Sequence, residues 1–197
     1  QDELATIYHG DCNEVMPFIT EKARVIITDP PYGINYKSNH RQTSFDFIEG
    51  DEEYPAEWLK LASNIATDSG TLYMFCNDRS FEDARKVLYQ TGFELKKTLI
   101  WDKMSLTGGD LDNYGDRVEF ILFGSKRRKP RLRGSRDGNL ISIPRIYNHN
   151  LRHPAEKPEL LMSYLVMKST DPDELVLDPF MGVGPVLVAA KKLGRRV

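Results

Sequence analysis

The sequence predicts an α/β fold in a single domain, built around an open and mostly parallel sheet. Two observations predict it. Short β-branched apolar runs alternate along the chain with segments of helical spacing, and clusters of Gly, Pro, Asn and Asp separate them. The 197 residues are 40% hydrophobic, which is enough for one sizeable core and excludes global disorder.

Each expected element has its own local signal. Apolar runs predict strands over 23–28, 71–76, 93–101, 117–123 and 174–177, with a short strand-like stretch over 5–9. Helical spacing predicts helices over 13–20, 56–66, 81–90, 157–168 and 185–193. Ser80 is the expected cap of the third helix, and Pro158 and Pro185 suit first turns. The polar stretch 34–54 has no period and is expected to be a loop.

Cysteine and histidine usage excludes several classes of protein. The two cysteines, Cys12 and Cys76, exclude a disulfide framework and a four-cysteine zinc site, and they fit a reducing cytoplasm. The four histidines show no ligand spacing with them, so no metal is assigned. No apolar run approaches the ~20 residues that cross a bilayer, so no membrane partner is expected.

Charge is distributed unevenly although the net charge is only −2. Residues 1–125 carry 12 Lys and Arg against 22 Asp and Glu, whereas residues 126–197 carry 15 against 7. Seven of the positive charges lie in the segment 126–136, which contains no acidic residue. Such a segment fits contact with a polyanion, and it equally fits a solvated basic loop.

The first predicted strand ends in Asp29-Pro30-Pro31-Tyr32. The residues before each proline are held extended, so the carbonyl of Pro30 points in a fixed direction. That carbonyl and the Asp29 carboxylate can both accept hydrogens from one amino group, while Tyr32 can stack on a flat ring. The motif therefore suits an exocyclic amine on a heterocycle, although a strand-ending turn is the ordinary alternative.

The last predicted strand ends in a second loop, Asp178-Pro179-Phe180-Met181-Gly182-Val183-Gly184. Glycines allow a ligand to approach the backbone closely, and the following helix start favours anionic groups. It is not the dinucleotide fingerprint, because Leu187 stands at the position of the third glycine. Taken alone, this loop is weak evidence, and a tight turn without a ligand is the default interpretation.

Together the two loops resemble the amino-group DNA methyltransferases that use S-adenosylmethionine. The Asp-Pro-Pro-Tyr form is typical of the N6-adenine enzymes. The order of the two loops, with the basic segment between them, resembles the circularly permuted β group. The motif 153–158 (His-Pro-Ala-Glu-Lys-Pro) and the motif 10–12 (Gly-Asp-Cys) match that group, and Trp101-Asp102-Lys103 and Glu119 match it less specifically.

The resemblance implies a Rossmann-like sheet of seven strands, of which the last is antiparallel, and S-adenosylmethionine as the cofactor. It implies a base pocket formed by Asp29, Pro30, Pro31 and Tyr32. The implied cofactor contacts are Asp11, Cys12, Asp29, His153, Lys157, Asp178, Pro179, Phe180, Gly182 and Gly184.

The expected macromolecular partner is double-stranded DNA, bound by a single catalytic domain over 1–197. The target-recognition region is expected at about 104–152. The implied DNA contacts are Lys37, Arg41, Lys126, Arg127, Arg128, Lys129, Arg131, Arg133 and Arg136. A homodimer fits the group, and no feature of the sequence identifies a restriction endonuclease partner.

Two positions depart from the family pattern. Pro185 stands where the family usually has Ser or Thr, which removes an N–H and a hydroxyl. The sequence also stops at Val197, before the acidic residue that ends the family's next strand. We expect the gene product to continue, since a sheet lacking that strand would leave unpaired edges.

The expected reaction is methyl transfer to the N6 amine of a flipped-out adenine. Asp29 and the Pro30 carbonyl accept the amine's hydrogens in this reaction, and no covalent enzyme intermediate is needed. N4-cytosine, RNA adenine and a protein glutamine amide remain open as alternative acceptors. A non-catalytic DNA-binding relative is the alternative from another class, and Pro185 supports it.

Overall fold

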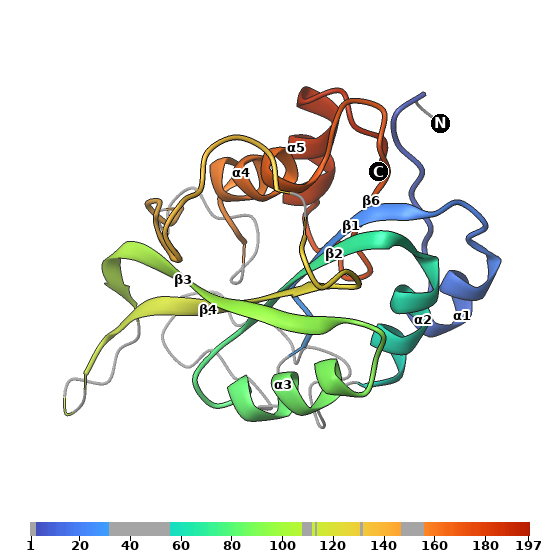
Figure 1. Ribbon diagram of the computed structural model, residues 1–197. Coiled ribbons are helices and arrows are strands. Elements are labelled where there is room, and N and C mark those ends of the chain that lie inside the picture. Colours follow the sequence, from blue (N-terminus) through green and yellow to red (C-terminus); the bar gives the residue numbers. More distant parts are fainter. Residues whose placement is uncertain (1–2, 32–55, 108–111, 113, 131, 147–155) are drawn as a thin grey trace.

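The computed structural model describes residues 3–31, 56–107, 112, 114–130, 132–146 and 156–197. Helices cover both faces of one sheet (Figure 1). The helices are α1 (Cys12–Val15), α2 (Glu57–Ile65), α3 (Phe81–Tyr89), α4 (Glu159–Ser169) and α5 (Pro185–Lys192), with a 3-10 turn η1 (Met16–Phe18). The strands are β1 (Ala23–Thr28), β2 (Ala66–Cys76), β3 (Glu94–Thr107), β4 (Asp116–Ser125), β5 (Leu140–Ser142) and β6 (Val176–Leu177).

The strand order across the sheet is β5-β3-β4-β2-β1-β6. β1 is parallel to β2 and β6, and β3 is parallel to β5, whereas β4 is antiparallel to both of its neighbours. The predicted α/β fold, mostly parallel with one antiparallel strand, is therefore confirmed. The carboxyl ends of all strands except β4 meet at one edge of the sheet, where ligands bind in such folds.

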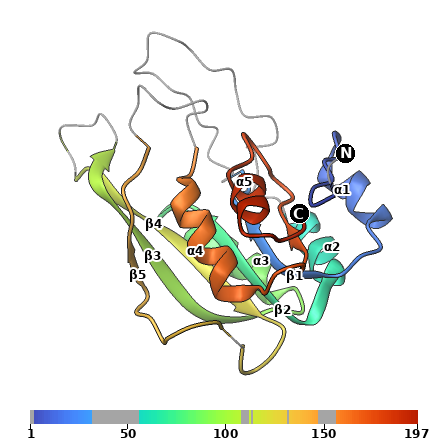
Figure 2. The same cartoon turned by 90° about the horizontal axis from the view of Figure 1, so that it is seen from above.

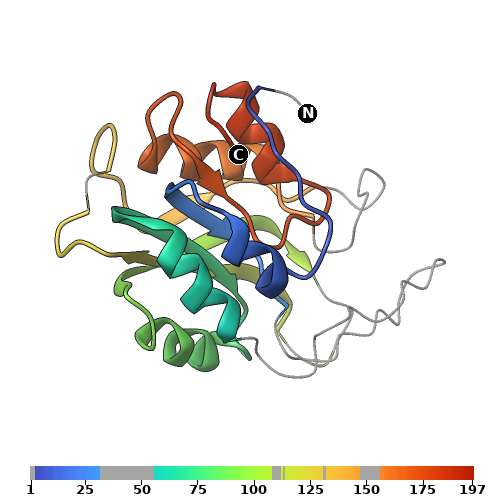
Figure 3. The same cartoon turned by 90° about the vertical axis from the view of Figure 1, so that its right-hand side faces the viewer.

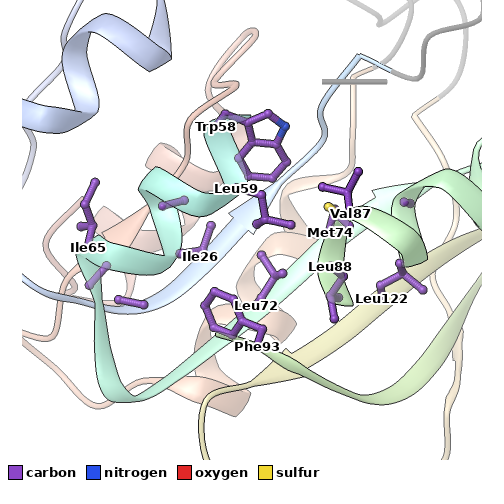
Figure 4. Close-up of a cluster of buried hydrophobic side chains, with 14 of the residues drawn as sticks. Ile26, Trp58, Leu59, Ile65, Leu72, Met74, Val87, Leu88, Phe93 and Leu122 are labelled. Atoms are coloured by element: carbon purple, nitrogen blue, oxygen red, sulfur yellow. The ribbon is translucent and has the colours of Figure 1, made fainter. Parts of the chain in front are cut away.

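Side chains of the central strands alternate between two apolar clusters. Ile26 and Leu72 face the cluster under α2 and α3 (Figure 4), whereas Val25 and Tyr73 face the cluster under α4 and α5. Viewed from above, α4 and α5 cross the second face of the sheet (Figure 2). All six residues of β1 are buried, which explains why its sequence is a continuous apolar run apart from Arg24 and Thr28.

The predicted strand 5–9 is wrong, because only Ala5 forms a bridge. The neighbouring N–H of Thr6 donates to the carbonyl of Val197 at 2.9 Å, and the N–H of Val197 donates to Leu4 at 2.8 Å. The N-terminal segment therefore lies beside the last residues of the chain (Figure 3). A pairing partner that is so distant in sequence leaves no local signal.

The helix predicted over 56–66 forms as α2, but β2 begins at Ala66, five residues before the predicted strand 71–76. Ala23 pairs with Ala66, but Val25 pairs with Thr71, so β2 carries extra residues. A Cβ at Gly70 would lie 2.9 Å from the Ala66 Cβ atom. Gly70 thus permits a bulge inside the strand.

Three further predictions differ from the structure. Ser80 is the N-cap residue of α3 as predicted, but its hydroxyl donates to the Asn77 side chain at 3.0 Å and makes no capping hydrogen bond. β3 extends beyond the predicted 93–101 to Thr107, pairing with Asp116 across the longer β3–β4 hairpin. β5 was not predicted, because three residues carry no periodicity. It is defined by bonds such as Ile100 N–H to Asn139 at 2.8 Å.

Six strands form among the described residues, whereas the resemblance implies seven. Arg196 lies next to β6, because its N–H donates to Glu174 and its carbonyl accepts from Val176. The residues expected to begin a further strand are thus hydrogen-bonded along β6. None of the described helices is both long and apolar enough to cross a membrane.

Candidate active site

The two loops singled out in the sequence leave neighbouring strands at the same edge. β1 and β6 are parallel, and Ile26 is paired with Leu177. Asp29 and Asp178 therefore follow adjacent strand ends, although they are far apart in sequence. This places a carboxylate on a rigid proline loop next to a glycine-rich turn, as the sequence predicted.

Asp29 is held by a buried lysine. The Lys157 Nζ atom donates to Asp29 Oδ2 at 2.5 Å, and the same nitrogen lies 3.0 Å from Glu119 Oε1. The exposed fraction of the side chain is 7% for Lys157, 10% for Glu119 and 23% for Asp29. Two acids on different strands therefore share one ammonium group that is nearly excluded from water.

The chain around Lys157 explains this position. Pro158 is the extended N-terminal cap of α4, so Lys157 precedes the helix rather than lying in its first turn as predicted. Burial lowers the pKa of Lys157, but the charges of Asp29 and Glu119 outweigh burial and raise it above the ordinary lysine value. The ammonium also lies 5.2 Å from the centre of the Phe75 ring.

Asp178 has a different environment. Its Oδ1 atom accepts from the N–H of Phe180, two residues later, at 3.1 Å. Burial raises the pKa of the Asp178 carboxyl to about 7, the hydrogen bond from Phe180 opposes this, and the negative charge of Asp29 adds to it. A carboxyl group in this state favours a ligand that supplies a donor or a positive charge.

The turn after Asp178 is open to a ligand. Gly182 and Gly184 have φ angles of +52° and +81°, which side chains rarely adopt. A Cβ at Gly182 would meet nothing within 4 Å. The N–H of Gly184 closes the turn on the Met181 carbonyl at 2.8 Å, and α5 begins at Pro185. The open backbone and the poorly paired carboxyl of Asp178 fit a cofactor with polar and cationic groups.

Trp58 supports this turn from α2. Its ring meets Phe180 edge-on, with centroids 5.2 Å apart. Trp58 is fully buried, and its packing also fixes an aromatic residue of the glycine-rich loop. Its indole nitrogen finds no acceptor in the described part of the chain.

Asp11 and Cys12 begin α1 on the face covered by α2. Asp11 is exposed and caps the helix, accepting from the N–H of Asn13 at 2.7 Å. Cys12 packs against the same apolar cluster as Phe180. Burial, followed by the negative charge of Asp11, raises the pKa of the Cys12 thiol, so the thiol stays neutral near pH 7.

The basic segment is not brought to the site. It follows β4, whose last residue, Ser125, pairs with Thr71 near the start of the parallel part of β2. Arg133 lies against Asp171, just before β6 begins. The described residues of 126–136 therefore lie at the edge of the sheet opposite Asp29. Of the predicted site residues, Tyr32, Lys37, Arg41, Arg131 and His153 lie outside the described residues.

Comparison with known proteins identifies the family. The family model N6_N4_Mtase, described as DNA methylase, matches residues 23–197. This chain belongs to the N6_N4_Mtase family of DNA methylases. The predicted family and a DNA methyltransferase activity are confirmed, whereas the choice between N6-adenine and N4-cytosine is not decided. The family depends on S-adenosylmethionine, as predicted.

Two similar proteins are type II methyltransferases, a name that indicates restriction-modification systems. M2.MboI of Moraxella bovis is 25% identical over 226 residues, covering 98% of this chain and 81% of the relative. M2.DpnII of Streptococcus pneumoniae is 26% identical over 205 residues, covering 89% and 76%.

Solved structures share the fold. The complex of M1.HpyAVI with S-adenosylmethionine has a TM-score of 0.72 at 25% identity, covering 98% of this chain and 90% of that one. The cytosine-N4-specific PvuII DNA methyltransferase has a TM-score of 0.77 at 19% identity, covering 98% and 80%, which shows a common fold only.

Proposed function

We propose that this DNA methylase transfers a methyl group from S-adenosylmethionine to the N6 amine of adenine in a specific DNA sequence. The observation that carries the proposal is the position of Asp29. Its carboxylate ends β1 beside the Asp178 turn and is followed by Pro30-Pro31-Tyr32, the form typical of N6-adenine enzymes.

The proline loop supplies the acceptors for the amine. Pro30 is buried, and the residue before each proline is restricted to an extended backbone. The Asp29 carboxylate and the Pro30 carbonyl accept the two hydrogens of the exocyclic amine. Holding both hydrogens localises the nitrogen lone pair and aims it at the methyl group, so positioning and fixed dipoles supply the rate.

The glycine-rich turn holds the cofactor in this proposal. Asp178, Phe180, Gly182 and Gly184 line the methionine and ribose end, and Asp11 reaches the adenine end. The bound cofactor supplies an electrophilic methyl group on a sulfonium. Pro185 offers no N–H, so the carboxylate of the cofactor depends on other donors of the turn.

Double-stranded DNA is the proposed partner, with the target base flipped out because a base inside a duplex cannot reach Asp29. We place target recognition in the region 104–152. DNA that also reaches the basic segment at the opposite edge must wrap around the end of the sheet. Affinity should then fall about 10³-fold or more between 50 and 200 mM salt, as measured by fluorescence anisotropy. A shallow salt dependence contradicts contact with this segment.

Nucleoside analysis tests the proposed reaction. The complete gene product is incubated with unmethylated DNA and isotope-labelled S-adenosylmethionine, and digested nucleosides are analysed by mass spectrometry. N6-methyladenine is the expected product, and Asp29→Asn is the matched negative control. N4-methylcytosine would keep the mechanism and change the base. Label found in RNA or in a protein glutamine would show that the substrate is not DNA. Cofactor binding without methylation of any acceptor would favour a non-catalytic relative.

A further inference from the structure

A chain of alternating charges runs from the proline loop into the sheet. Lys157 Nζ lies 2.5 Å from Asp29 and 3.0 Å from Glu119, and Lys103 Nζ lies 3.7 Å from the other carboxylate oxygen of Glu119. Asp29 follows β1, Lys157 precedes α4, Glu119 lies on β4 and Lys103 lies on β3. Only the tertiary fold brings them together.

Glu119 lies between the two lysines. It lies on β4 opposite Trp101, and it is 8% exposed as a residue. Carboxylates in such positions are costly unless they are paired. Glu119 meets one ammonium from each side, Lys157 at one oxygen and Lys103 at the other. Its carboxylate is therefore held in one orientation between two fixed cations.

The consequence for Lys157 follows from this geometry. A lysine ammonium on a flexible stem has three donors and no preferred direction of its own. Here Glu119 binds one side of the ammonium, and the adjacent Phe75 ring limits its movement. The same ammonium donates a hydrogen bond to Asp29 Oδ2. The sheet, through Glu119, thereby determines where the Asp29 carboxylate stands.

We infer that Lys157 and Glu119 are positioning residues for Asp29: Glu119 anchors the Lys157 ammonium, and the ammonium fixes one Asp29 oxygen and keeps the carboxylate charged. This rests on the proposed function, in which Asp29 accepts hydrogens from the target amine. It gives Lys157 a role toward the carboxylate rather than the cofactor contact that the family resemblance implies.

Other titratable groups face Asp29 and must be considered. Asp178 lies at the neighbouring strand end, and its charge acts on the same site. Cys76 ends β2, and burial together with the Glu119 and Asp29 charges raises the pKa of its thiol to about 12, so it stays neutral in the working range. Lys103 stands behind Glu119. Burial raises the pKa of Asp178 to about 7, so its titration must be separated from that of Asp29.

Two variants should shift the pH profile in opposite directions. Lys157→Met removes the cation, so Asp29 takes up a proton more easily. The acid limb of the single-turnover rate should move up by about one to two pH units. Glu119→Gln removes an anion from the far side of the ammonium, which leaves the cation to Asp29, so the limb should move down. A purely structural role gives no shifts of opposite sign.

The rates separate positioning from cofactor binding. At pH 7.5 and saturating cofactor, Lys157→Met should lower kcat about 100-fold and Glu119→Gln about 10-fold. The KM for S-adenosylmethionine should change less than threefold in both, and Lys157→Arg should recover part of kcat. Saturation with cofactor also suppresses the titration of Asp178, which acts on cofactor binding.

The matched control is Lys192→Met. Lys192 pairs with Glu159 at 2.7 Å on the surface of α5 and α4, where the lysine side chain is 63% exposed. Its loss should leave kcat and the pH profile within twofold of wild type. A raised KM with unchanged acid limb in Lys157→Met would overturn the inference in favour of a cofactor contact, and so would shifts of the same sign.

A measurement independent of activity distinguishes this inference from the proposed function. The carboxyl carbons of ¹³C-labelled Asp are titrated by NMR, and the Asp29 signal is identified by its loss in Asp29→Asn. Its midpoint should rise in Lys157→Met and fall in Glu119→Gln. Unmoved midpoints refute the positioning pair even in an active enzyme. An inactive wild-type chain with shifted midpoints refutes the proposed reaction alone.

Discussion

Asp29 and Asp178 are the same residue type at the ends of adjacent parallel strands, yet the fold treats them in opposite ways. Asp29 is bound by a lysine that lies 128 residues later in the chain. Asp178 accepts a hydrogen bond from its own turn, and burial raises its pKa to about 7. The Asp29 carboxylate is therefore paired with a cation of the protein. The Asp178 carboxyl has no such cation among its partners in the described part of the chain and can pair with a bound ligand.

The backbones of the two loops differ in the same sense. Pro30 and Pro31 restrict the backbone of the first loop, so the acceptors that we propose there are oriented before any substrate binds. The second loop bends through Gly182 and Gly184, whose φ angles are positive, and the space beside Gly182 is open to a ligand. A rigid loop suits residues that must hold an acceptor in place during a reaction. A loop with accessible backbone suits the binding of a cofactor.

The largest expected effect follows from removing the charge of Asp29. Asp29→Asn keeps the shape of the side chain but exchanges an anionic acceptor for an amide. Methyl transfer in a single-turnover assay should fall by at least about 10³-fold, because the amine loses its charged acceptor. The KM for S-adenosylmethionine should change little.

The fold should survive this substitution, since Lys157 keeps its ion pair with Glu119. Near-wild-type melting temperature and cofactor affinity would show this. Substantial methylation by Asp29→Asn would mean that the Pro30 carbonyl alone suffices, and the contrast between the two acids would fail.

Asp178→Asn should increase the free energy of unfolding of the cofactor-free protein, whereas Asp29→Asn should leave it nearly unchanged. A carboxyl whose pKa is raised by folding stabilises the native state fully only below its unfolded pKa of ~4, and this contribution is lost as pH rises toward 7. Removing the acid should therefore stabilise the cofactor-free protein at pH 8 by about 2–4 kcal/mol, and by less at pH 5. Urea denaturation at the two pH values measures this.

The same variant should lose cofactor affinity by about 30-fold in calorimetry, since the charged acceptor for the ligand is gone. Asp171→Asn is the control, because Asp171 forms an ion pair with Arg133 at the surface. That substitution should destabilise slightly or not at all. A loss of stability in Asp178→Asn would show that its carboxyl is satisfied in the free protein.

Cofactor affinity of the wild-type protein should depend on pH through Asp178. A cationic ligand prefers the ionised carboxylate, so a proton must leave when it binds below pH 7. The dissociation constant should fall between five- and tenfold from pH 6 to 7.5, and Asp178→Asn should remove this slope. A flat profile in the wild type means that another group carries the charge.

Much of the fold could be predicted because most strands have a recognisable pattern in their own sequence. β1 was found with its correct bounds, since six buried residues in a row leave a continuous apolar pattern. β5 and the bridge at Ala5 were missed, because their bonds run to Ile100 and Val197, far away in sequence. The first residues of β2, 66–70, were missed, since a bulge depends on the partner strand.

The site was predictable to the level of its loops. Asp29 and Asp178 were found because prolines and glycines mark strand ends. The difference between the two acids was not, because Lys157 and Glu119 reach Asp29 only through packing. The basic segment drew attention by charge, yet charge density along a sequence does not say at which edge of a sheet it will lie.

The smallest expected effect concerns the backbone of the second loop. Gly182→Ala introduces a side chain at φ +52° where nothing lies within 4 Å, so the cost in the free protein is backbone strain of about 1 kcal/mol. Gly194→Ala is a matched control, with φ +69° and equally open space just after α5. The two should lower the melting temperature alike, by a few degrees.

Only Gly182→Ala should weaken cofactor binding, because only there does a ligand need to approach the backbone. Calorimetry with S-adenosylmethionine measures the difference between the two variants. Equal affinities would mean that the Asp178 turn is an ordinary strand-to-helix connection, and the second loop would lose the role that distinguishes it from the first.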